Sequence, residues 1–123
     1  MKLSVATNWD PKLISSIRKF NVSNLYGTLN HTIIGGGRAS SDIPSVSKDL
    51  VESHIKEAHK NKINFTWILN ASCTANREFS RPNYKNLIEH LEWLKSIKID
   101  TITIANPFLL DLIKEQFPSF QTK

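Results

Sequence analysis

INFTWIL, residues Ile63–Leu69, is the stretch of sequence that decides the fold. β-Branched and aromatic residues dominate it, and this composition favours a β-strand. Its apolar and threonine-rich character is typical of a strand in a parallel sheet that is covered on both faces. The flanking segments are therefore expected to supply the covering helices.

The segment before this strand has the pattern of an amphipathic helix. Ser47 can cap its N-terminus, and Asp49 is well placed against the positive end of the helix dipole. Apolar residues recur at helical spacing and predict one buried face. Its members are Leu50, Val51, Ile55 and Ala58.

The segment after the strand repeats this arrangement. A polar loop leads to Pro82, which is expected to begin a helix, and residues 101–105 (TITIA) are expected to form the next strand. Asn106 and Pro107 then predict the start of a last helix over 108–117, which ends before the next proline. The helix after Pro82 has a long apolar stripe: Tyr84, Leu87, Ile88, Leu91, Leu94 and Ile97.

The N-terminal part contains two more strands and one helix. Strands are expected over Leu3–Thr7 and Val22–Leu29. Asp10 and Pro11 predict a capped helix between them. Its apolar face is expected to consist of Leu13, Ile14, Ile17 and Phe20.

Strands and helices thus alternate along the whole chain. This order predicts an α/β fold with a parallel sheet and right-handed crossovers, built from about four βα units. A doubly wound open sheet and a partial (β/α) TIM-barrel-like sheet both fit the pattern. No linker interrupts the sequence, so residues 1–123 are expected to form a single domain.

Composition narrows the function classes. The chain is 40% hydrophobic, carries a net charge of +5, and has no apolar run of the ~18 residues that a membrane helix needs. No secretory signal pattern opens the sequence, and Cys73 is the single cysteine, so a cytoplasmic location without membrane attachment is expected. The lysines are scattered along the chain, so the sequence supports nucleic-acid binding only weakly.

A first candidate loop follows the second strand and contains three of the four glycines. Gly35, Gly36 and Gly37 permit positive φ angles or a close approach of the backbone to a ligand, and Arg38 could bind a carboxylate or phosphate. The loop lacks both the dinucleotide-binding and the Walker A spacing. We expect it to form the flexible rim of a substrate pocket.

A second candidate loop follows the strand at 63–69 and is rich in polar side chains. Asn70 stands where a parallel strand ends, which is where active-site side chains of β/α barrels usually lie. Cys73 is either a nucleophile or, more simply, a small buried residue. Asn76, Arg77 and Glu78 are expected to line the pocket, or Arg77 and Glu78 to form an ion pair that orders the loop.

Metal binding is not expected within this chain. His54 and His59 are five residues apart on one predicted helix, which is not the i, i+4 spacing of a metal pair. Asp42 and Glu78 are the only acids in the strand-end loops, and they form no obvious catalytic pair. The sequence assigns no catalytic residue.

Four stretches together resemble the N-terminal half of the barrel in the collagenase-like peptidase family U-32: LSVATNWD (3–10), LYGTLNHTIIGGGRAS (25–40), HIKEAHKNKINFTWILNASCTANREFSRP (54–82) and LEWLKSIKIDTITIANPFLLDLIKEQFP (91–118). The resemblance covers essentially the whole chain. It implies a peptidase with a pocket at the carboxyl ends of the strands and a peptide as substrate. Other members of the family hydroxylate RNA or act in ubiquinone synthesis, and they hold an iron–sulfur cluster with four cysteines.

Those cysteines lie beyond the matched region, so this chain is expected to hold no such cofactor alone. A full barrel needs ~250 residues, and four units form about half of it. Its first and fourth strands would then be open edges, with inward-facing apolar side chains exposed. We therefore expect a second half-barrel chain or a homo-oligomer as partner. The alternatives left open are a peptidase, a non-catalytic binding or assembly subunit, and part of an RNA- or ubiquinone-hydroxylating enzyme.

Overall fold

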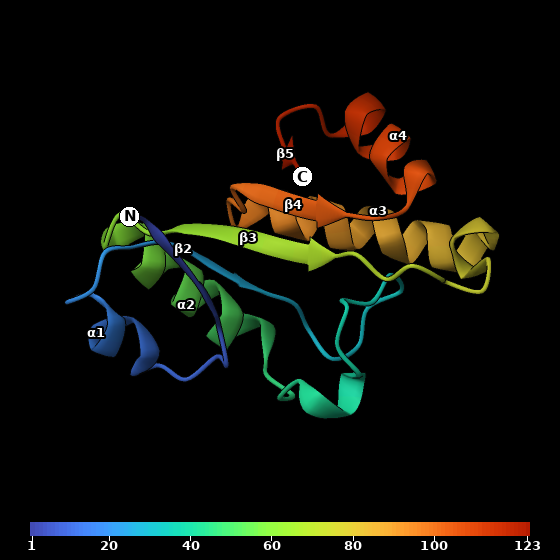
Figure 1. Ribbon diagram of the computed structural model, residues 1–123. Helices are drawn as coiled ribbons and strands as arrows, with labels where there is room; N and C mark the ends of the chain where they lie inside the picture. Colours follow the sequence, from blue (N-terminus) through green and yellow to red (C-terminus); the bar gives the residue numbers. More distant parts are fainter.

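Five parallel strands form one sheet in the order β1-β2-β3-β4-β5, in the computed structural model of residues 1–123 (Figure 1). The predicted parallel α/β fold is thereby confirmed. The strands are β1 (Leu3–Ala6), β2 (Val22–Gly27), β3 (Asn64–Leu69), β4 (Thr101–Ile104) and β5 (Gln121–Thr122). The α-helices are α1 (Leu13–Ile17), α2 (Lys48–Lys60), α3 (Arg81–Ser96) and α4 (Pro107–Gln116), and two short 3-10 helices are η1 (Ser40–Asp42) and η2 (Arg77–Phe79).

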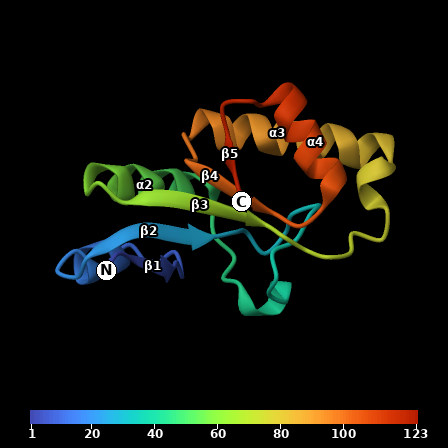
Figure 2. The same ribbon diagram turned by 45° about the horizontal axis from the view of Figure 1, so that its top comes forward.

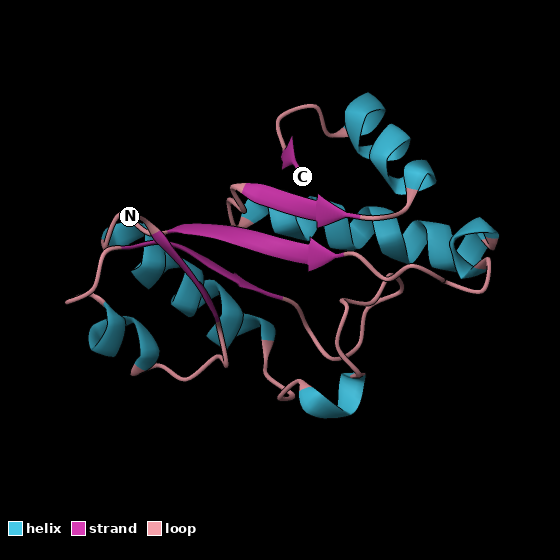
Figure 3. Cartoon of the chain, viewed as in Figure 1, coloured by secondary structure: helices cyan, strands magenta, loops and turns pink.

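Helices α2 and α3 cover one side of the central strands. They lie on the same side of β3 and β4 in two views (Figures 1 and 2), and each strand runs next to its neighbour in the sequence (Figure 3). Trp67 of β3 points to this side, with its ring centroid 5.6 Å from that of Trp93 in α3. Trp93 in turn donates from Nε1 to Glu52 of α2 at 3.1 Å. The aromatic residues of β3 thus join the sheet to both helices.

The helix-covered face of the sheet forms the hydrophobic core. Leu25 lies opposite Phe65, and Trp67 lies opposite Ile102, so these residues share one face. All four side chains are fully buried. Burial of apolar surface on this face is the main source of stability.

The opposite face is polar, contrary to the expectation of exposed apolar side chains. Tyr26 lies opposite Thr66, and Thr66 lies opposite Thr101. The hydroxyl of Thr66 donates to Oδ1 of Asn24 at 2.9 Å. Ile68 is the one large aliphatic residue of β3 on this face. Because the side chains bond to one another across strands, this face does not form an exposed apolar surface.

The sheet edges also differ from the prediction. Gln121 and Thr122 pair with Thr101 and Ile102, so β4 is covered by β5. The open edges are therefore those of β1 and β5. The two residues of β5 are too few to give a periodic pattern in the sequence.

Two predicted helix caps are confirmed, and the first helix is shorter than predicted. The Ser47 hydroxyl accepts from the Leu50 N–H, and the Asn106 side chain accepts from the Phe108 N–H. Asp10 instead caps a turn by accepting from the Lys12 N–H at 2.8 Å, and α1 begins only at Leu13. Helix α1 ends at Ile17, so the expectation that Phe20 packs in the core is wrong, and that side chain is 56% exposed.

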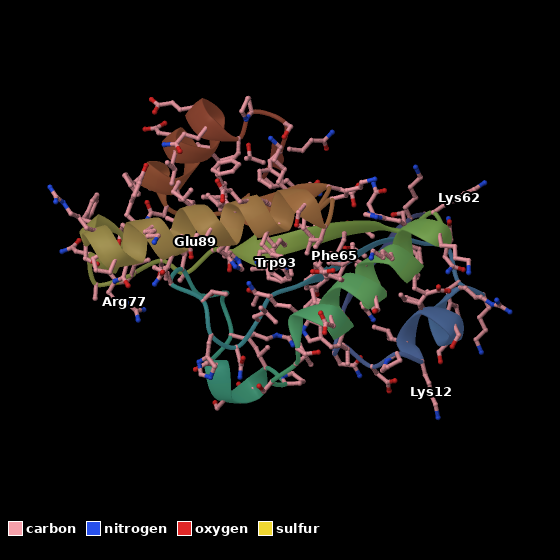
Figure 4. All side chains as sticks on the ribbon, turned by 180° about the vertical axis from the view of Figure 1, so that it is seen from behind. Lys12, Lys62, Phe65, Arg77, Glu89 and Trp93 are labelled. Carbon is pink, nitrogen blue, oxygen red and sulfur yellow. The ribbon has the colours of Figure 1, made fainter.

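Helices α2 and α3 end in the same backbone motif, with lysine in a left-handed conformation. Lys62 has φ 60° and Lys98 has φ 62°. After each lysine, an isoleucine N–H bonds back to the last turn, from Ile63 to Ala58 and from Ile99 to Leu94. These are the bonds of a Schellman motif, in which glycine is the usual left-handed residue. Figure 4 shows Lys62 at one end of the molecule, remote from Arg77.

Replacing Lys62 with glycine is expected to raise the free energy of unfolding by about 0.5–1 kcal/mol, because glycine removes the steric cost of the left-handed conformation. Urea denaturation checks this through the transition midpoint at constant slope. Lys60→Gly is the matched control, since Lys60 lies in the right-handed last turn of the same helix. That control should lower stability, and equal effects of the two substitutions would contradict the explanation.

Candidate functional site

A cavity of about 330 Å³ lies at the carboxyl ends of β1, β2 and β3. Parallel α/β proteins bind their ligands at this end of the sheet. Its walls come from three segments: the loop after β1, the end of β2 with the glycine loop, and the end of β3. The lining residues are Ala6, Thr7, Asn8, Trp9, Tyr26, Gly27, Thr28, Gly36, Gly37, Arg38, Asp42, Ile43, Pro44, Ile68 and Asn70.

Two polar side chains in this cavity lack hydrogen-bond partners. Thr28 follows β2 and is only 6% exposed, and its hydroxyl bonds to no group of the chain. The Asn70 side-chain oxygen is likewise buried without a partner. A buried polar atom without a partner costs about 1–3 kcal/mol, so such atoms usually meet a ligand or a water molecule. Thr28 and Asn70 therefore mark the polar part of the cavity.

The glycine loop lies directly against these two residues. None of the glycines has a positive φ, so that use of the triple glycine, which the sequence permitted, does not apply. A Cβ on Gly36 would lie 2.8 Å from Cγ2 of Thr28, and one on Gly37 would lie 3.4 Å from Oδ1 of Asn70. The loop is also tied to the end of β3, because the Ala71 N–H donates to the Gly35 carbonyl at 2.9 Å. Close approach therefore explains the glycine at position 36.

Trp9 forms one wall of the cavity. It stacks on Phe65 with ring centroids 5.6 Å apart, and its Nε1 donates to the Thr28 carbonyl at 3.3 Å. Gly27 leaves space for Thr7 next to this wall, since a Cβ there would lie 2.5 Å from Cγ2 of Thr7. Neither Trp9 nor Thr28 was predicted from the sequence to be a site residue. Their position in the sequence could have indicated a role in the site, because each follows the end of a parallel strand.

A second, more polar hollow of about 500 Å³ adjoins the cavity and shares Gly36, Arg38 and Ile43 with it. Arg77 and His31 also line this hollow. The predicted residues Gly36, Gly37, Arg38 and Asn70 thus come together around the cavity, and Gly35 and Arg77 line the adjoining hollow.

Asn76 and Glu78 lie at neither cavity. Glu78 is 5% exposed, accepts from the Thr74 hydroxyl, and accepts from Asn106 Nδ2 at 3.1 Å. The Thr74 hydrogen bond lowers the pKa of the Glu78 carboxyl below its usual value, so this residue stays charged. Arg77 makes no ion pair with it; the Nε of Arg77 donates to the Thr74 carbonyl at 3.0 Å, and its charge acts on Glu78 only from a greater distance. The expected ion pair is therefore wrong, and Glu78 orders the loop through neutral partners.

Cys73 is exposed, so the expectation of a small buried residue is wrong. No group of three or more histidine, cysteine, aspartate or glutamate side chains is arranged to hold a metal ion. Some members of the family that this chain resembles hold an iron–sulfur cluster with four cysteines. The residues of this chain do not fit such a cluster, because the chain has one cysteine. None of the helices is both long and apolar enough to cross a lipid bilayer.

Parallel strands, connecting helices and a cavity at the carboxyl end of the sheet define a partial β/α-barrel protein. "Uncharacterized protease MJ1657" of Methanocaldococcus jannaschii is 29% identical over 85 residues, which cover 66% of this chain and 24% of that protein. The solved structure of the U32 peptidase Mk0906 has a similar fold, with a TM-score of 0.71 and 12% identity, over 99% of this chain and 47% of that one. No model of a known protein family matches the sequence.

These matches confirm the resemblance to the U32 peptidase family that the sequence motifs indicated. The structural match also confirms the fold as a partial parallel barrel. The chain spans about a quarter of the length of the curated relative and about half of the solved structure.

Proposed function

We propose that this chain is the substrate-binding, N-terminal half of a U32-like peptidase barrel, and that its cavity binds a segment of peptide. The main support for this proposal is that two buried polar groups of the cavity lack hydrogen-bond partners. Thr28 presents a buried hydroxyl, and Asn70 presents a side-chain amide. A peptide group offers the complementary donor and acceptor, while Tyr26 and Ile68 offer apolar walls for a side chain.

The remaining half of the barrel is proposed to supply the chemistry. The edges of β1 and β5 leave unpaired backbone groups that another chain segment could complete. Such a segment would close the sheet over its polar face. A peptide would then be enclosed between Asn70 on this half and groups on the other. Peptide cleavage by the isolated chain would contradict this division of roles.

A non-catalytic binding or assembly subunit is the second candidate. The two open parallel edges favour it, because they can pair with a second copy as well as with a different chain. Sizing by light scattering separates a self-associating chain from one that needs another partner. A stable monomer would argue against assembly through the edges.

For either function we propose a cytoplasmic location, because exposed Cys73 suits a reducing compartment.

Binding of capped peptides tests the proposed cavity. Acetylated and amidated tripeptides with aliphatic or aromatic residues are expected to shift the NMR signals of Thr28, Gly36 and Gly37. Asn70→Ala is expected to weaken binding about tenfold, because it removes both hydrogen-bonding atoms of the amide. Affinity is measured by NMR titration or calorimetry.

Asn64→Ala is the matched control for this experiment. Asn64 begins β3 at the end remote from the cavity and is exposed, whereas Asn70 directly follows the other end of the strand. The control should bind peptides as the unaltered chain does. Binding that survives Asn70→Ala unchanged, or that shifts signals only elsewhere in the sheet, would overturn the assignment of the cavity.

A further inference from the structure

The hollow beside the cavity is lined by two arginines and by no acidic residue. We propose that it binds the carboxylate of a peptide whose adjoining uncharged part occupies the cavity. This inference rests on the proposed function, since it names the class of peptide that the same site accepts. The ligand would carry this carboxylate at its free C-terminus, next to the residue in the cavity.

The lining of the hollow carries the first part of the inference. Arg38 and Arg77 both line it, together with His31, and no aspartate or glutamate does. Arg38 makes no hydrogen bond from its side chain and no ion pair within the chain. Arg77 uses only its Nε, at 3.0 Å from the Thr74 carbonyl, so its two terminal nitrogens lack partners in the chain. Guanidinium groups bind carboxylates through two parallel hydrogen bonds, which suits free terminal nitrogens.

The backbone of the glycine loop supports the same ligand. The N–H groups of Gly36, Gly37 and Arg38 donate to no acceptor within the chain. The loop lies between the two spaces, and Gly36 and Arg38 line both of them. One ligand can therefore contact Asn70 in the cavity and the guanidinium groups in the hollow. Unused backbone donors beside two arginines favour an anionic group at this junction.

Asp42 defines the orientation of the ligand. It lines the cavity but not the hollow, and it makes no ion pair. A carboxylate placed in the cavity would meet the negative charge of Asp42 beside Arg38, whereas in the hollow it would meet both Arg38 and Arg77 and no acidic side chain. The carboxylate is thus directed to the hollow, and a neutral or basic residue is directed to the cavity.

Paired peptides test the inference. Acetylated tripeptides of one sequence are titrated as the free acid and as the C-terminal amide. The acid is expected to bind about tenfold more tightly, because it alone makes charge-assisted bonds to the arginines. In Arg38→Gln the two forms should bind within about threefold of each other. Since Arg38 has no bond within the chain, this substitution should leave thermal unfolding unchanged.

Arg18→Gln is the matched control. Arg18 is exposed at the end of α1, and this substitution changes the net charge by the same amount as Arg38→Gln. It should retain the preference for the acid. Equal binding of acid and amide by the unaltered chain would overturn the inference while leaving the proposed peptide cavity intact. Failure of both peptides to bind would overturn the proposed function itself. Inorganic phosphate is titrated as a further probe, and tighter binding of phosphate than of the peptide acid would contradict a carboxylate site.

Discussion

Replacing Trp67 with alanine is expected to lower the free energy of unfolding by about 3–5 kcal/mol, among the largest effects of any single truncation in this chain. The side chain is fully buried at the centre of β3. Its ring contacts Trp9 with centroids 6.0 Å apart, Phe65 at 6.2 Å, and His90 at 5.7 Å. Alanine would leave a cavity where the sheet, the loop after β1 and α3 meet.

The unpaired indole nitrogen makes this expectation sharper. Nε1 of Trp67 is buried without a hydrogen-bond partner, so its removal leaves no acceptor without a donor. The loss therefore reflects lost packing, partly offset by the removal of a buried donor that has no partner. Trp67→Phe, which keeps a ring and discards the unpaired nitrogen, should cost less than half as much as Trp67→Ala. Urea denaturation gives both values, and a loss below about 1 kcal/mol for the alanine variant would contradict the central place of Trp67 in the core.

The importance of Trp67 could be predicted from the sequence because it depends on a local pattern. Apolar runs such as 63–69 and the helical spacing of Leu87, Leu91 and Leu94 reflect burial directly. The caps at Ser47 and Asn106 follow from the short range of their hydrogen bonds. Strand order follows from alternation, because each crossover returns the chain beside the strand before it.

The candidate site was only partly predictable, because it depends on the paths of long loops. Asn70 and Arg38 were identified by their positions after strands, and the structure brings both to the cavity. Glu78 was misplaced because its partners, Thr74 and Asn106, are decided by how two loops meet. Thr28 was missed because a single threonine at a strand end has no distinctive spacing. Thr28 stands out only through its missing hydrogen bond, which depends on the three-dimensional structure.

The polar face of the sheet shows a related limit of pattern analysis. Thr66, Thr101 and Asn24 suit a strand covered on both sides as well as one that is open. Only the strand register shows that they share one face, and only the positions of α2 and α3 show that helices cover the other. The sequence therefore predicted a partial barrel correctly while giving the wrong chemistry for its inner face. A polar inner face fits the proposed site, because it continues the polar lining of the cavity along the strands.

The second large effect is expected from pH, through His90. Burial, with a smaller contribution from the charge of Lys48, lowers the pKa of His90 from 6.5 to about 4. Below pH 6.5 His90 takes up a proton in the unfolded chain, whereas in the folded chain it does so only near pH 4. The contribution of neutral His90 to the free energy of unfolding is therefore fully present above pH 6.5 and is lost as the pH falls toward 4. The shift corresponds to a loss of about 3 kcal/mol across the window. Burial also lowers the pKa of His54, which adds a loss of the same sign.

His90→Phe separates this effect from the other titrating groups. The ring of His90 packs 5.6 Å from Trp93 and its Nε2 is buried without a partner, so phenylalanine keeps the aromatic contact and cannot titrate. Urea denaturation between about pH 7 and pH 5 confines the measurement to histidines, because the stabilising charge of Glu78 is lost only at lower pH. The variant should show a much shallower fall in stability over this range. Lys48→Gln should show an intermediate slope, since it removes the charge that opposes protonation of His90. A slope in His90→Phe equal to that of the unaltered chain would mean that His90 does not control the acid sensitivity of the fold.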